Sequence, residues 1–194
     1  MKRIHVGAPL TLLVAAGCVL GTYLPAAGHF GIGGSLASLL LPWTWVRLVT
    51  WPFVHAGTGH LLGNLMFLLL LSPNLEQKQG WFEYLFCLLA TAVVIGLGQL
   101  AFGPGNAVLV GASGWVFMMI LLSTFVGGEP GTVSVPTLIV AALYGFQEVR
   151  AALEPNHVSQ FAHLLGGACG LTFGLLGSAQ AAANEPRRAP AGAG

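Results

Sequence analysis

Residues 162–170 read AHLLGGACG and lie inside an apolar run, 158–177, that contains no aspartate, glutamate, lysine or arginine. A run of this length is long enough to cross a bilayer as a helix. Gly166 and Gly170 follow His163 at three and seven residues, so they share its helix face. A bare glycine face lets a second helix approach closely. The stretch therefore predicts a membrane helix whose histidine faces a tightly packed neighbour.

The composition of the whole chain also indicates a membrane protein. Of its 194 residues, 55% are hydrophobic and only 7% are charged, and the mean hydropathy is +0.80. Segments in lipid must satisfy their own backbone polar groups, and the alternation typical of a transmembrane barrel is absent, so we expect an all-α integral membrane protein. The formal net charge of +1 provides no basic patch for nucleic acid.

Breaks rich in glycine, proline, asparagine or charge divide the chain into apolar segments. The first follows Lys2 and Arg3 and is too long for a simple signal peptide, so we expect it to be retained as a span. Six transmembrane helices are predicted, which places both chain ends on one side of the membrane. The six predicted helices span residues 8–27, 59–73, 81–102, 112–127, 132–147 and 158–177.

The distribution of lysine and arginine predicts the orientation of this bundle. Five of these residues fall on the side of the chain ends and two on the other, which places the ends and the 74–80 turn in the cytoplasm. We expect residues 1–178 to form one domain and residues 179–194, which are small, polar and proline-containing, to form a disordered cytoplasmic tail. The five lysines and arginines on the side of the chain ends are Lys2, Arg3, Lys78, Arg187 and Arg188, and the two on the opposite side are Arg47 and Arg150.

Two connecting stretches are predicted to be structured. The segment between the first two spans carries Trp43, Trp45, Trp51 and Arg47, residue types that favour the boundary between lipid and water, so we expect an interfacial loop. The fourth span is short and follows FGPGNAVLVG, residues 102–111. A short helix that starts below the surface implies that this loop dips into the protein. Water is therefore expected to reach the start of the fourth helix.

Polar side chains at membrane depth form the candidate site. They are His60, Asn64, Ser113 and His163, on the second, fourth and sixth predicted spans. A serine alone in an apolar helix usually bonds to a carbonyl of its own helix, and glycines alone can serve packing. The serine and the histidines together indicate a catalytic site, because serine becomes a nucleophile only with a base such as histidine. The chain contains no aspartate and its glutamates lie near segment ends or in loops, so we expect a Ser–His dyad.

A second group of donors is expected beside the dyad. His60 and Asn64 are four residues apart and share a helix face. Ser113 lies between Gly111 and Gly114 at a predicted helix start, where backbone N–H groups are unpaired and the helix dipole favours negative charge. The His60 ring, the Asn64 amide and the Ser113 N–H therefore suit an oxyanion hole.

Three motifs in this order resemble the rhomboid family of intramembrane serine proteases, in its minimal six-helix bacterial form. They are HAGTGHLLGN at 55–64, GASG at 111–114 and AHLLGGACG at 162–170, and the resemblance covers about residues 43–175. It implies Ser113 as the nucleophile, His163 as the general base, and His60 with Asn64 in the oxyanion hole.

The resemblance also assigns roles to further residues, and three positions depart from the family's pattern. Arg47 matches the arginine of the family's first-loop Trp-Arg motif, although Val46 precedes it. Glu76 with Lys78 matches a Glu-x-Arg pair at the cytoplasmic end of the second helix, with lysine in place of arginine. Phe117 stands where the family often has a tyrosine stacked on the catalytic histidine, so we expect stacking without a hydroxyl.

Two further expectations concern access to the site. The fifth segment, 132–147, contains Pro136 and lacks a glycine face, so it is the candidate lateral gate for substrate. The stretch 147–160 after it is expected to form a cap that includes His157, and His55 is expected to be a peripheral polar group of the cavity or of an interface.

The sequence therefore predicts a serine endopeptidase of the bacterial inner membrane that cleaves transmembrane segments of protein substrates near their extracytoplasmic end. No metal or other cofactor is implied, and the oligomeric state is left open. One alternative is a rhombosortase-like protease that trims glycine-containing C-terminal sorting anchors. Alternatives of another class are a catalytically inactive rhomboid-like binding factor, and a metal or transport protein that uses His55, His60, His157 and His163.

Overall fold

The computed structural model describes residues 7–25, 27–126, 135, 138–140, 142–143 and 158–184. Five of the six predicted spans correspond to α-helices among them. Most of the fifth segment and residues 147–157 of the expected cap, including His157, lie outside the described residues, whereas 158–160 form the start of α7. The elements in chain order are α1 (Pro9–Tyr23), the 3-10 helix η1 (Ala27–Phe30), β1 (Ile32–Gly33), η2 (Leu36–Leu40), α2 (Pro42–Thr50), η3 (Trp51–Phe53), α3 (Thr58–Gln79), α4 (Trp81–Phe102), β2 (Val108–Leu109), α5 (Ser113–Ser123) and α7 (Val158–Asn184).

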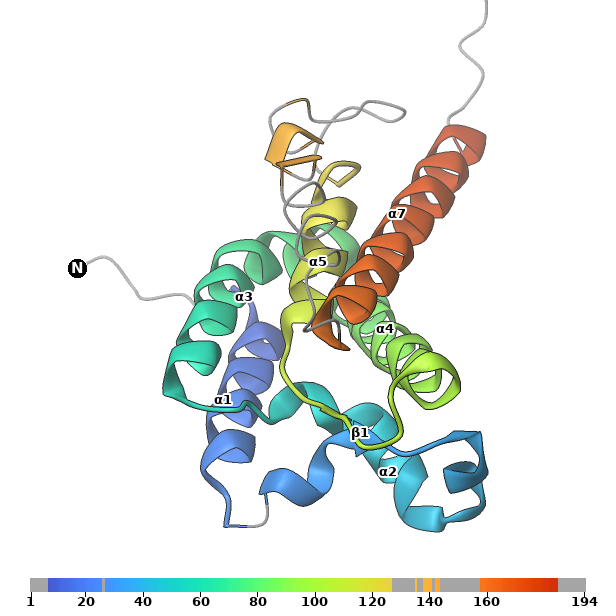
Figure 1. Cartoon of the computed structure of the whole chain (residues 1–194). Coiled ribbons are helices and arrows are strands. Elements are labelled where there is room, and N and C mark those ends of the chain that lie inside the picture. Colours follow the sequence, from blue (N-terminus) through green and yellow to red (C-terminus); the bar gives the residue numbers. More distant parts are fainter. Residues whose placement is uncertain are drawn as a thin grey trace, which may run out of the picture.

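Helix α5 is the central element. Figure 1 shows it between α3 and α1 on one side and α4 and α7 on the other, and its most extensive packing is against α7. Residues 114–120 and Leu122 are all buried, so α5 has no wide lipid-facing stripe. A helix that is apolar on every side belongs in a core. The chain thus places the start of α5, with Ser113, inside the protein.

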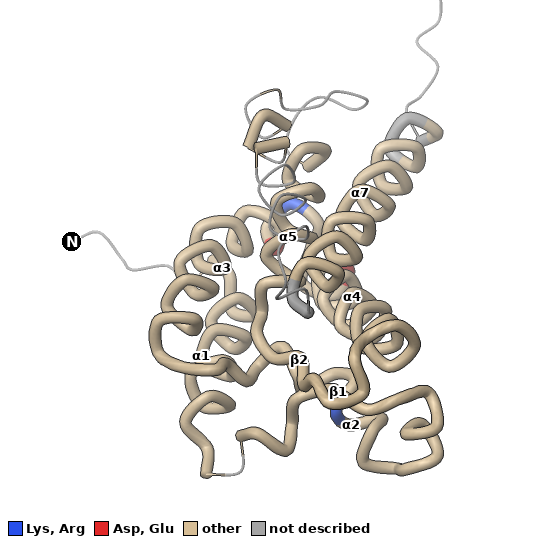
Figure 2. Tube along the Cα trace, in the orientation of Figure 1, with Lys and Arg blue, Asp and Glu red and all other residues tan. Residues whose placement is uncertain are grey.

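The helices fit a membrane protein in length and hydropathy. Within the described ranges, α4 and residues Gln160–Gln180 of α7 could each cross a bilayer, while α1 and α5 are apolar but shorter. Residues Pro42–Phe53 and Thr58–Gln79 pass the same test only together, as one element bent by 78°. Figure 2 shows how little of the trace carries charge. The count of six spans stays a prediction.

Several helix ends differ from those predicted. Helix α1 stops at Tyr23 rather than residue 27, because Leu24 precedes a proline and adopts an extended conformation. Helix α3 passes through Pro73 and continues to Gln79, so residues 74–79 are helical rather than a turn. Helix α7 continues to Asn184, into the stretch expected to be disordered, and the alanines at 179 and 181–183 favour this extension.

A small β-pairing corrects the expectation of a purely helical chain. Ile32 and Gly33 pair antiparallel with Leu109 and Val108, which joins the first loop to the loop before α5. Two-residue strands have no periodicity that a sequence could show. The pairing explains how an irregular loop is tolerated next to the site, because it satisfies backbone groups that lipid could not.

The first turn of α1 is capped by a side chain from α3. The carboxylate of Glu76 accepts hydrogen bonds from the backbone N–H of Leu10 (2.9 Å) and from the N–H and hydroxyl of Thr11 (both 2.8 Å). Ala8 provides no side-chain cap, and Pro9 has no N–H. A carboxylate at a helix N-terminus also interacts favourably with the positive end of the helix dipole. Glu76 is therefore a buried structural residue in the last turn of α3, at the helix end where the sequence placed it.

The same carboxylate ends a chain of hydroxyl groups. Tyr84 donates to Ser72 (2.8 Å). Because the Thr11 hydroxyl hydrogen goes to Glu76, Ser72 donates to Thr11 across their 2.7 Å separation. The chain links α4, α3 and α1 at a buried position.

We expect Glu76→Gln to destabilise the protein by about 2–4 kcal/mol. The glutamine amide keeps one acceptor oxygen but turns an NH₂ group toward a buried N–H donor. Thermal unfolding in detergent measures the loss. The matched control is Glu83→Gln, whose side chain is exposed in the first turn of α4. Equal unfolding midpoints for the two variants would contradict the capping role.

Candidate active site

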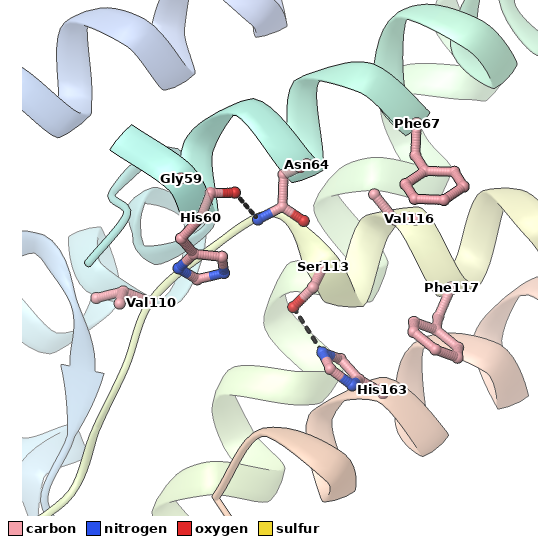
Figure 3. Close-up of a pocket in the computed structure, with 10 residues that line it drawn as sticks. Gly59, His60, Asn64, Phe67, Val110, Ser113, Val116, Phe117 and His163 are labelled. Atoms are coloured by element: carbon pink, nitrogen blue, oxygen red, sulfur yellow. Dashed lines mark hydrogen bonds between the residues drawn. The ribbon is translucent and has the colours of Figure 1, made fainter. Parts of the chain in front are cut away.

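A pocket of about 400 Å³ opens where α3, α5 and α7 meet. The predicted polar residues all line it, together with apolar side chains and two glycines. Figure 3 shows its members: Gly59, His60, Gly63, Asn64, Phe67, Val110, Ser113, Val116, Phe117 and His163.

Ser113 and His163 are in direct contact in this pocket. The Ser113 Oγ lies 2.7 Å from the His163 Nε2, and Figure 3 shows the two side chains pointing toward each other from α5 and α7. This distance is within the range required for a nucleophile and its base. For the serine to donate its proton, the histidine must carry its own hydrogen on Nδ1.

The close approach of α5 and α7 depends on glycine. A Cβ at Gly166 would lie 2.2 Å from the Gly114 carbonyl oxygen, and a Cβ at Gly170 would lie 2.2 Å from the carbonyl oxygen of Met118. Gly114 itself faces Ile95, whose Cδ1 would be 2.5 Å from an added Cβ. The predicted glycine face therefore packs directly on the backbone that follows Ser113, and it sets the distance of the histidine.

An aromatic ring fixes the plane of the histidine. Phe117 and His163 stack with ring centroids 4.7 Å apart and planes at 8°. Phe117 lies one helical turn after Ser113 and is buried. The stacking surface expected from the sequence is thus present on a ring without a hydroxyl.

His60 and Asn64 project into the same pocket from successive turns of α3 (Figure 3). The Ala56 N–H points at His60 Nδ1 from 3.5 Å, which favours the hydrogen on Nε2. One Asn64 amide hydrogen goes to the His60 carbonyl at 3.1 Å. Gly111 has φ +110°, and a Cβ there would lie 2.7 Å from His60 Nε2. The glycine thus allows the loop before Ser113 to run against the imidazole.

The two predicted structural residues lie outside this pocket. Glu76 caps α1, as described above. The Arg47 Nε donates to the Gly31 carbonyl, which joins α2 to the segment entering β1. Two exposed tryptophans support the same loop, since Trp43 donates to the His29 carbonyl (3.3 Å) and Trp45 to that of Leu39 (3.0 Å).

His55 does not line the pocket, but it is closely connected to it. It is only 5% exposed, and its Nε2 accepts the N–H of Ala112 at 3.2 Å, a contact that the sequence does not predict. No local pattern signals a contact between residues 57 positions apart. Within the part of the chain that the structure describes, no three histidine, cysteine or acidic residues are grouped so as to hold a metal ion.

Comparisons with known proteins agree with the motifs. The family model described as Rhomboid domain matches residues 42–180. The chain is 30% identical over 130 residues to a putative rhomboid protease, YdcA, of Bacillus subtilis, covering 63% of this chain and 62% of that protein. It is 39% identical over 114 residues to the chloroplastic Rhomboid-like protein 11 of Arabidopsis thaliana, covering 55% and 39%. It is 26% identical over 146 residues to Rhomboid-type serine protease 2 of Emericella nidulans, covering 74% and 29%. The chain thus spans less than two thirds of the length of each of these relatives.

Proposed function

This chain belongs to the rhomboid family, and from that premise we propose that it is an intramembrane serine protease with Ser113 and His163 as its catalytic pair. The observation that carries the proposal is the 2.7 Å contact between Ser113 Oγ and His163 Nε2 inside an apolar helical bundle. Relatives named as serine proteases support the reaction class.

The geometry supports a two-step acyl transfer. Ser113 Oγ attacks the scissile carbonyl while His163 Nε2 takes its proton. The tetrahedral oxyanion is stabilised by N–H donors, for which His60 Nε2, the Asn64 amide and the backbone of Ser113 are the candidates. His163 then gives the proton to the leaving amine. A water molecule, deprotonated by the same histidine, releases the acyl group and restores the serine.

The proposed substrates are transmembrane segments of other proteins, cut near their extracytoplasmic ends. Two features support this. Helix α5 is only 11 residues long, so its first residue, Ser113, is expected to lie below the membrane surface. The lysine and arginine distribution supports cytoplasmic chain ends. Because the motifs resemble the minimal six-helix bacterial form of the family, we place the protein in a bacterial inner membrane.

The test uses the full chain reconstituted in liposomes. A transmembrane reporter should be cleaved, and a fluorophosphonate probe should label Ser113, as located by mass spectrometry of the digested protein. A second reporter with a C-terminal Gly-Gly anchor distinguishes rhombosortase-like trimming from cleavage of general transmembrane segments. Failure of the probe to label Ser113, with neither reporter cut, would refute the proposal.

We expect Phe117→Ala to lower kcat by up to about tenfold, because the stack that orients His163 contributes about 0.5–1.5 kcal/mol. Phe117→Tyr should keep the stack and most of the rate. Phe86→Ala is the matched control, since Phe86 is 62% exposed and contacts Phe173 away from the pocket. Reporter cleavage at several substrate concentrations separates kcat from KM. An unchanged kcat in Phe117→Ala would show that the stack does not orient the base.

A further inference from the structure

The two residues before Ser113 are held by a segment that comes much earlier in the chain. The N–H of Gly111 donates to the Trp51 carbonyl at 3.4 Å, and the N–H of Ala112 donates to His55 Nε2 at 3.2 Å. Ala112 is completely buried and His55 nearly so. Residues 51–55 therefore take both backbone donors that immediately precede the nucleophile.

Hydrogen-bond directions define the state of the His55 ring. A backbone N–H can only donate, so Nε2 accepts from Ala112 and the hydrogen of the neutral ring is on Nδ1. Nδ1 lies 3.1 Å from the hydroxyl oxygen of Thr22 and donates to it. The Thr22 hydroxyl in turn donates to the Cys18 carbonyl at 2.7 Å. A continuous chain thus runs from α1 through one imidazole to the loop that carries Ser113.

This chain of bonds bears on the geometry of the site. Ser113 is the first residue of α5, so its N–H has no acceptor within the helix. Gly111 has a φ of +110°, and the Gly111–Ala112 peptide therefore has rotational freedom that other residues would not allow. The bond from the Ala112 N–H to His55 fixes the orientation of this peptide and so restricts the backbone that leads directly into Ser113.

We propose that His55 is a positioning residue for the nucleophile, acting by accepting the Ala112 N–H. The inference rests on the proposed protease function, because it assigns a purpose within that site. His55 acts through the backbone before Ser113 and has no direct part in proton transfer. The competing explanation is that His55 only satisfies a buried donor and so contributes to stability alone.

Three substitutions separate these explanations. His55→Gln places an amide oxygen near the former Nε2 and keeps an acceptor for Ala112. His55→Asn is too short to reach Ala112 but keeps a donor toward Thr22, and His55→Phe keeps only the ring. We expect kcat to fall about 100-fold in the Asn and Phe variants, as small misplacements of catalytic groups do, with KM unchanged. His55→Gln should recover most of the rate. The control His29→Gln, at an exposed histidine, should behave as wild type.

The readouts are kcat and KM for the reporter, the rate of fluorophosphonate labelling at Ser113, and the thermal unfolding midpoint. Lower midpoints with unchanged kcat in the Asn and Phe variants would overturn the positioning role and leave a structural one. A Gln variant as slow as the Phe variant, at equal stability, would also overturn it, because the acceptor would then be irrelevant.

A measurement that does not depend on activity completes the test. Nitrogen NMR of the protein labelled with ¹⁵N-histidine shows which ring nitrogen carries the hydrogen, and His55→Gln identifies the resonances. We expect Nδ1 of His55 to be protonated and Nε2 to be unprotonated. A hydrogen on Nε2 would overturn the inference. If wild-type protein neither cleaves nor reacts at Ser113 while His55 shows the expected tautomer, the proposed function has failed and the hydrogen-bond chain has not.

Discussion

Replacing Ser113 by alanine is expected to lower cleavage of a transmembrane reporter by about 10⁴- to 10⁶-fold, because the acyl-transfer route loses its nucleophile. His163→Ala should cost a comparable factor, since the serine hydroxyl is a poor nucleophile without its base. Residues that act as one unit are strongly non-additive, so the double variant should be no slower than the slower single variant.

The measurement is cleavage in liposomes, with probe labelling at Ser113 in parallel. Ser123→Ala is the matched control, because Ser123 ends the same helix and does not line the pocket. All variants should unfold near the wild-type temperature. Cleavage by Ser113→Ala at even a tenth of the control rate would exclude Ser113 as the nucleophile, and strong labelling of His163→Ala would exclude the histidine as its base.

Gly166→Ala is expected to have the second largest effect. The added Cβ would lie 2.2 Å from the Gly114 carbonyl oxygen, 3.0 Å from its carbon and 3.1 Å from its Cα, and all three are backbone atoms that cannot rotate away. Helix α7 must therefore move from α5, which separates His163 from Ser113. A shift of about 1 Å is enough to reduce the rate about 100-fold, and we also expect a lower unfolding midpoint.

Gly167→Ala provides the control on the neighbouring residue. Its Cβ would have no contact nearer than 3.9 Å, to the Leu121 side chain, so it fits without a shift. Alanine in place of glycine should even favour the helix by up to about 1 kcal/mol. Reporter cleavage and thermal unfolding of both variants measure the difference. Wild-type activity in Gly166→Ala would show that the glycine contact does not set the distance between the two catalytic groups.

The pocket residues could be predicted from the sequence because lipid-facing helices are almost uniformly apolar. Ser113, His163, His60 and Asn64 stand out against that background, and helical spacing places His60 with Asn64 and His163 with its glycines. Packing of α7 on α5 then brings the groups together. Figure 3 shows all four around one pocket, as that spacing indicated.

The supporting contacts could not be predicted because they join distant residues. His55 reaches Ala112 across 57 positions, and Glu76 reaches Thr11 across 65. The apolar pattern indicates a helix end at Pro73, whereas α3 continues through it to Gln79, which places Glu76 in the last helical turn rather than in a loop. The pairing of β1 with β2 involves two residues on each side, too few for any pattern to show.

The cap on α1 has a consequence for how the protein is made. The first turn of α1 enters the membrane from the ribosome long before Glu76, which lies 65 residues after Thr11. Until α3 is synthesised, the N–H groups of Leu10 and Thr11 lack the carboxylate that accepts them in the folded protein. Completion of the first turn of α1 is therefore coupled to the synthesis of α3.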